Sequence, residues 1–137
     1  MAYGVATPEA TTDTAAERPA RQAYQILHIA FIIAPIIAGL DKFFNILVDW
    51  SQYLAPFIGD IISPAIFMSI VGVVEIVAGI GVAVKPRIFS YVVAAWLLGI
   101  IINLLILGDY YDIALRDLGL FLGALALARL SGVYGPR

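Results

Sequence analysis

The chain has 137 residues, of which 62% are hydrophobic and 13% are charged, a composition far from that of an ordinary soluble domain and indicative of one integral membrane domain. Its net charge of −2 and lack of a long basic run give no support to a nucleic-acid partner or to recruitment by anionic lipid. The absence of cysteine excludes disulfides, thiol relays, cysteine-bound iron–sulfur clusters and c-type haem, and a single histidine, His28, excludes bis-histidine haem ligation by one chain.

Residues 1–20 are small and polar and include Pro8 and Pro19. They lack the apolar run of a signal peptide, so we predict an extramembrane tail rather than a cleaved leader. Such a segment is disordered in isolation, and order within it would indicate that a partner subunit holds it. The predicted domain organisation is therefore a docking tail over 1–20 and a transmembrane domain over 21–137.

Four apolar segments follow, each near the ~20 residues that a helix needs to cross a bilayer. Glu75 is the one charged residue of the second, Asn103 interrupts the third, and Arg116 and Asp117 lie in the first turn of the fourth. We predict an all-α polytopic membrane protein, a four-helix transmembrane bundle. Its spans cover about 24–44, 64–84, 88–107 and 114–130.

The connections and the charges outside the spans predict an orientation. Lys85-Pro86-Arg87 must join the second and third helices as a tight antiparallel hairpin, whereas 45–63 carries aromatic residues typical of a membrane interface. Cations and acids separate to opposite sides, so the positive-inside rule predicts an inner-membrane protein with both termini in the cytoplasm. The cations are Arg18, Arg21, Lys85, Arg87, Arg129 and Arg137, and the acids are Asp49, Asp60, Asp109 and Asp112.

Polar residues and glycines share a stripe on each predicted helix. In lipid, glycine lets backbones approach and polar side chains turn toward one another, so we expect these stripes to form the bundle interior. They are His28, Pro35, Gly39 and Lys42; Gly72, Glu75 and Gly79; Gly99 and Asn103; and Arg116, Gly119 and Gly123.

Helical rise places the polar residues in two layers. Glu75 lies roughly 17 Å from the outer edge, whereas Lys42 lies roughly 27 Å from the inner edge and close to the outer face. We therefore expect no direct Lys42–Glu75 pair, and Glu75 is nearest in height to His28. The outer layer comprises Asp41, Lys42, Asn103, Arg116 and Asp117.

Each polar group has a packing interpretation and a functional one. The outer layer forms two mutual ion pairs that lock the first helix to the fourth, with Asn103 as an interhelical hydrogen-bond partner, or it binds an anionic or quinone-like headgroup. His28 is a packing residue near the interface, or a ligand or proton relay. Glu75 is a hydrogen-bonding carboxylic acid that fixes helix packing, or a group that handles protons.

The sequence resembles the DoxX-like membrane proteins. The resemblance rests on Gly39-Leu40-Asp41-Lys42 at the end of the first span, Glu75-Ile76-Val77-Ala78-Gly79 in the second, a short basic turn, and a fourth span of small residues. It covers most of residues 21–130 and implies a four-helix bundle in which Lys42 and Glu75 match the family's polar positions. Some members are subunits of a thiosulfate:quinone oxidoreductase, and here Ala78 stands where glycine is common.

Two main hypotheses of function follow, and both leave the chain without an intrinsic cofactor. The first is an accessory subunit of a respiratory or photosynthetic redox complex, without independent catalytic activity, whose partners are the bilayer and other membrane subunits. The alternative is a quinone-reactive or proton-handling subunit that uses Glu75, His28, Lys42 or Arg116, with quinone or a bound lipid as ligand. A small transporter is a third hypothesis, although no inverted repeat is evident. No spacing of residues suggests a metal site.

Overall fold

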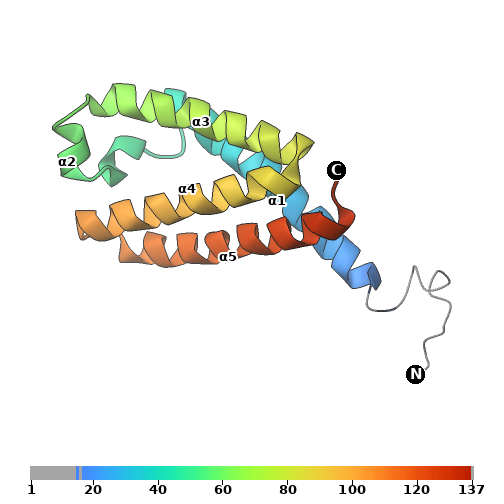
Figure 1. Ribbon diagram of the computed structural model, residues 1–137. Helices are drawn as coiled ribbons and strands as arrows, with labels where there is room; N and C mark the ends of the chain where they lie inside the picture. Colours follow the sequence, from blue (N-terminus) through green and yellow to red (C-terminus); the bar gives the residue numbers. More distant parts are fainter. Residues whose placement is uncertain (1–14, 16, 137) are drawn as a thin grey trace.

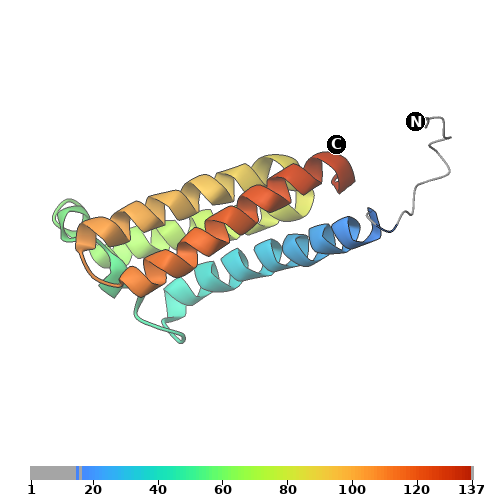
Figure 2. The same ribbon diagram turned by 90° about the horizontal axis from the view of Figure 1, so that it is seen from below.

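The computed structural model describes residue 15 and residues 17–136, and the regular structure in this part of the chain is helical (Figures 1 and 2). Each predicted span lies within one long helix. The first helix begins earlier than expected and includes residues 17–20, while most of the predicted docking tail lies outside the described residues. The elements are α1 (Glu17–Phe44), a 3-10 turn η2 (Trp50–Tyr53), a short α2 (Pro56–Gly59), α3 (Pro64–Val84), α4 (Pro86–Leu107) and α5 (Tyr111–Tyr134).

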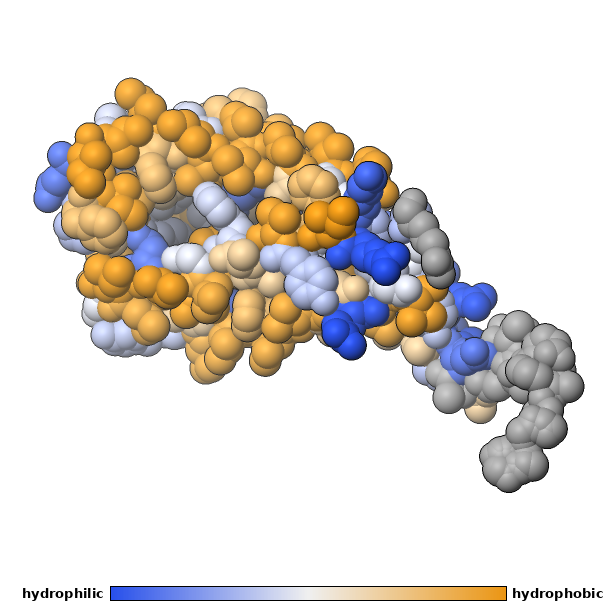
Figure 3. All heavy atoms as spheres, viewed as in Figure 1, coloured by the Kyte–Doolittle hydropathy of each residue, from blue (hydrophilic) through white to orange (hydrophobic). Residues whose placement is uncertain are grey.

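The outer surface of the bundle is apolar. Helices α1, α3 and α4 are long and apolar enough to cross a membrane. Hydrophobic residues cover much of the face shown in Figure 3. Many large aliphatic side chains are about half exposed, including Ile37, Val77 and Ile102. Soluble proteins rarely expose a contiguous apolar surface of this size, so the fold is that of a multi-pass membrane protein. α5 carries charged residues in its first two turns and is not among the helices that are apolar enough to cross a membrane by this measure.

Proline and glycine fix where the helices begin and end. Pro64 and Pro86 occupy the first turns of α3 and α4, where a missing N–H costs no helical hydrogen bond. Gly108 ends α4 in the left-handed region, at φ 78°, which favours glycine. Lys85 alone separates α3 from α4, so the tight antiparallel hairpin expected at this position is confirmed.

Helices α1 and α3 meet backbone to backbone at two glycines. A Cβ on Gly39 would lie 2.6 Å from the carbonyl oxygen of Gly72, and a Cβ on Gly72 would lie 2.7 Å from that of Gly39. Two turns further along α3, a Cβ on Gly79 would lie 2.9 Å from the carbonyl oxygen of Ile32. These contacts fix the antiparallel register, and only glycine fits them.

Helices α4 and α5 pack just as closely through alanine and serine instead of glycine. Buried small residues recur at a spacing of three or four residues, which lets the two helices approach. A Cβ added to Gly99 or to Gly119 would meet no atom within 4 Å, so the predicted place of these two glycines in the bundle interior is wrong. Among these buried small residues are Ser90 and Ala94 on α4 and Ala124, Ala128 and Ser131 on α5.

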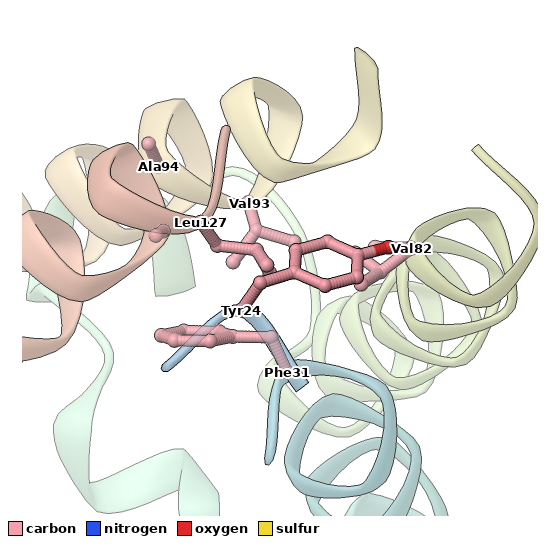
Figure 4. Packing of buried hydrophobic residues seen from close by; sticks show 8 residues of the cluster. Tyr24, Phe31, Val82, Val93, Ala94 and Leu127 are labelled. Atoms are coloured by element: carbon pink, nitrogen blue, oxygen red, sulfur yellow. The ribbon is translucent and has the colours of Figure 1, made fainter. Parts of the chain in front are cut away.

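The bundle thus consists of two tight helix pairs, α1 with α3 and α4 with α5, joined by fewer contacts. An apolar core lies where all four long helices meet, nearer the end at which α1 begins. Figure 4 shows Tyr24 and Phe31 of α1 close to Val82 of α3, Val93 of α4 and Leu127 of α5. The buried charged residues Asp41, Lys42, Glu75 and Asp117 lie beyond this core, toward the end where α2 is located.

The glycine contact between α1 and α3 gives the first prediction. Gly72→Ala puts a methyl group against backbone and against the Phe43 ring, so we expect a loss of about 1–3 kcal/mol in stability. Thermal unfolding of the purified protein in detergent measures the change. Gly99→Ala is the matched control, because its methyl group meets open space; equal midpoints for the two variants would contradict the contact.

Candidate functional site

A buried ion pair joins α1 to α3. The ammonium Nζ of Lys42 lies 2.5 Å from Oε1 of Glu75, and the two side chains are 6% and 11% exposed. The expectation that these residues do not pair is therefore wrong, as is the expectation that Glu75 shares a layer with His28. Two opposite charges at this distance, withdrawn from solvent, interact far more strongly than an exposed pair.

The geometry of antiparallel helices explains the error. In the register fixed by Gly39 and Gly72, the Cα atoms of Lys42 and Glu75 are offset by about 9 Å along the helix axes. Side chains on a helix lean toward its N-terminus, so these two lean toward each other and cover the offset. Gly72 also makes room for the lysine, since a Cβ there would lie 3.3 Å from Cβ of Lys42.

The indole of Trp50, in η2, covers the lysine. Nζ of Lys42 lies 3.8 Å from the centroid of the Trp50 ring, a cation–π contact. The indole Nε1–H donates to Oδ2 of Asp41 at 2.8 Å. Trp50 is thus held by two adjacent residues at the end of α1, Asp41 and Lys42.

Asp41 organises the chain that leaves α1. Its carboxylate accepts hydrogen bonds from the backbone N–H groups of Ile46, at 2.9 Å, and Leu47, at 3.0 Å. It is 7% exposed and makes no ion pair with a described residue. The predicted ion pair between Asp41 and α5 is therefore wrong, because this carboxylate satisfies the backbone of the turn instead.

The second helix pair contributes Trp96 and Asp117. The buried indole nitrogen of Trp96 makes no hydrogen bond within the described part of the chain, yet it lies beside the Glu75 carboxyl group. Asp117, 3% exposed, is near enough to act on Glu75 electrostatically. Arg116 does not reach α1 as predicted: it donates to Asp117 through Nε and Nη2, and its side chain is 64% exposed.

Asn103 fastens the η2–α2 segment to α4. Its amide donates to the carbonyl oxygen of Tyr53 at 2.6 Å and accepts from the N–H of Ala55 at 2.9 Å. Asn103 makes hydrogen bonds as expected, but the predicted interhelical partner is wrong, because both bonds go to the segment that connects α1 to α3. Ala55 is fully buried as a result.

His28 lies at the other end of the bundle. Its Nε2 is 2.7 Å from the carbonyl oxygen of Val82, and since a carbonyl can only accept, Nε2 carries the proton. The ring also stacks on Tyr24, with centroids 5.2 Å apart. Val82 is seven residues from Glu75, or about 10 Å along α3, so these contacts favour the packing interpretation of His28.

Of the predicted polar residues, the fold brings Lys42, Asp41, Glu75 and Asp117 to one region, which we call the polar centre together with Trp50 and Trp96. Sequence reasoning missed both tryptophans as members. A tryptophan among apolar residues is usually interpreted as lipid-facing. The periodicity of the sequence does not show that its indole N–H points toward polar groups inside the bundle.

The polar centre can bind or release a proton, or accept a polar group. It holds one ammonium and three carboxyl groups within a bundle whose outer surface is apolar. Within the described residues no cluster of His, Cys, Asp and Glu side chains could hold a metal ion. Figure 3 shows the surface hollowed between the apolar ridges of α3 and α4 near α2, with hydrophilic residues next to the hollow.

No protein-family model, no curated protein and no solved structure matches this chain.

The polar centre gives the second prediction. Lys42→Met and Glu75→Gln each leave the other member without its partner, so each variant should lower stability. The double variant should lose about 1–3 kcal/mol less stability than the sum of the losses of the two single variants, because it removes both members of the pair together. Unfolding of all four proteins in the same detergent gives the coupling energy.

Arg116→Gln serves as the control for that cycle. The arginine side chain is 64% exposed, and a glutamine in its place keeps an amide donor beside the buried Asp117 carboxylate, so we expect a loss of no more than about 1 kcal/mol. Strict additivity of the Lys42 and Glu75 substitutions would show that the pair contributes no coupling.

Proposed function

We propose that the chain is a small accessory subunit of a membrane-bound redox complex, respiratory or photosynthetic, related in architecture to the DoxX-like proteins. The observation that carries the proposal is the division of the molecule into a self-paired polar interior and an apolar exterior. Lys42 binds Glu75, Asp41 binds its own turn, and Asp117 binds Arg116. A bundle that satisfies its charges internally can act as a rigid scaffold for neighbouring membrane subunits.

The proposal includes four spans, an inner-membrane location and cytoplasmic termini. The support for a fourth span is that α5 packs along the length of α4, an apolar helix long enough to cross the membrane. The support for the orientation is the position of Lys85 and Arg87 at the end where α1 begins and α5 ends.

Cysteine labelling tests this topology, because the natural chain has no cysteine. We expect a cysteine at Gly132, near the end of α5, to react with an impermeant maleimide only after cells are opened. A cysteine at Gln52, in the segment between α1 and α3, should react in intact cells. The reverse labelling pattern would overturn the proposed orientation. The same labelling at both positions would overturn the proposed topology, in which the three spans α3, α4 and α5 separate Gln52 from Gly132.

The alternative function is proton handling or quinone reaction at the polar centre. A specific observation favours it: the Glu75 carboxyl group contacts Lys42 and lies beside the buried indole N–H of Trp96, which has no hydrogen-bond partner among the described residues. Glu75 would exchange the proton, and Trp96 and Lys42 would contact a carbonyl or hydroxyl headgroup. Ionisable groups inside a membrane bundle commonly mark such sites.

One preparation tests both functions. Membranes carrying the wild-type chain or Glu75→Gln are solubilised gently, and native electrophoresis with mass spectrometry identifies the chains in each band. We expect the 14.8 kDa chain in a much larger assembly that contains redox subunits. Its quinone turnover is then measured for the wild type and the variant.

The two functions predict different results. For an accessory subunit, Glu75→Gln leaves turnover unchanged once the complex has assembled. For a proton-handling subunit, turnover falls at least about 100-fold while assembly persists. A free monomer or a small homo-oligomer in the wild-type sample would contradict the accessory function.

A further inference from the structure

Cations that are scattered along the sequence gather at one end of the fold. Because α3 and α4 form a hairpin and α1 runs antiparallel to α3, the start of α1, the α3–α4 turn and the end of α5 share this end (Figure 1). Among the residues that the structure describes, Glu17 is the acidic residue at this end. Figure 3 shows hydrophilic residues concentrated at this end. The cations are Arg18, Arg21, Lys85, Arg87 and Arg129.

A hollow opens between α1 and α5 at this basic end. It is lined by Arg21, Tyr24 and Gln25 of α1 and by Val133 and Tyr134 of α5. The side chains that line it supply a guanidinium, an amide and two phenol groups, all of which can donate hydrogen bonds. This is a set of donors suited to an anion, in contrast to the shallow, mainly aliphatic groove between α1 and α3.

Arg21 lines the hollow and is held against Tyr134 of α5. Its guanidinium lies 5.5 Å from the centroid of the Tyr134 ring, and it makes no ion pair within residues 17–136. Stacking on a ring occupies the face of a guanidinium and leaves its N–H edge available. That edge matches the oxygens of a phosphate group in a two-pronged hydrogen-bonding geometry.

The surface beside the hollow indicates the source of the phosphate. Val133, at its rim, is 74% exposed, and Ile26, the next residue on α1 after the lining, is 68% exposed. A free phosphate ion makes no use of exposed aliphatic side chains, whereas the acyl chains of a phospholipid cover them. The basic end around the hollow favours a lipid of net negative charge.

We propose that the hollow between α1 and α5 is a binding site for the phosphodiester of an anionic phospholipid, held by Arg21 with Gln25 as an additional donor. This site is separate from the polar centre, which lies near the opposite end of the bundle. It does not depend on either proposed function.

Native mass spectrometry of the full chain, released from detergent containing phosphatidylglycerol or phosphatidylcholine, tests the site. We expect the wild type to retain one phosphatidylglycerol at least about tenfold more tightly than phosphatidylcholine. Arg21→Gln should remove that preference, because a charge-assisted hydrogen bond is worth about a tenfold change in affinity. Gln25→Leu should weaken binding about threefold.

Arg87→Gln is the matched control, since it removes one charge from the same end without altering the hollow. It should change phosphatidylglycerol affinity by less than about twofold, because Arg87 does not line the hollow. A loss equal to that of Arg21→Gln would overturn the site in favour of general attraction to the basic end. Unchanged binding in Arg21→Gln would overturn it too, as would displacement of the lipid by millimolar inorganic phosphate. Equal thermal midpoints confirm that the variants are folded.

Discussion

The contact between Gly39 and Gly72 is the constraint on which the polar centre depends. It fixes how far α1 is displaced along α3, and this displacement decides which polar side chains meet. A register shifted by one turn, about 5.4 Å, would separate Lys42 from Glu75 and leave two unpaired charges in an apolar bundle. Packing and electrostatics therefore select the same register, which makes alternative arrangements of these helices unfavourable.

The segment between α1 and α3 extends this arrangement to the end of the bundle where α2 lies. Asp41 holds the turn that follows α1, and Trp50 bridges from Asp41 to the Lys42 ammonium. Asn103 anchors the same segment to the other helix pair. The connection is thus part of the polar centre, and its conformation depends on charged residues at a helix end rather than on turn-forming residues alone.

The sequence predicted the long helices well, because apolar runs of bilayer length leave little choice of structure. It failed at the Lys42–Glu75 pair, since a depth counted along helix axes ignores the length and lean of the side chains. It also failed at Gly119, because glycine lies on both inner and outer faces while alanine and serine form the α4–α5 contact. Which face a small residue occupies is decided by the partner helix, and a single sequence does not contain that information.

The arrangement in two tight helix pairs has a mechanical consequence. Each pair is held together by more contacts than join it to the other pair. The motion that costs the least free energy therefore slides or tilts one pair as a rigid unit against the other, with Lys85 as the hinge between α3 and α4. Lys42 and Glu75 belong to one unit, whereas Trp96 and Asp117 belong to the other. Such a displacement would keep the ion pair intact while changing its neighbours, and would thereby alter the hydration and the electric field that Glu75 experiences.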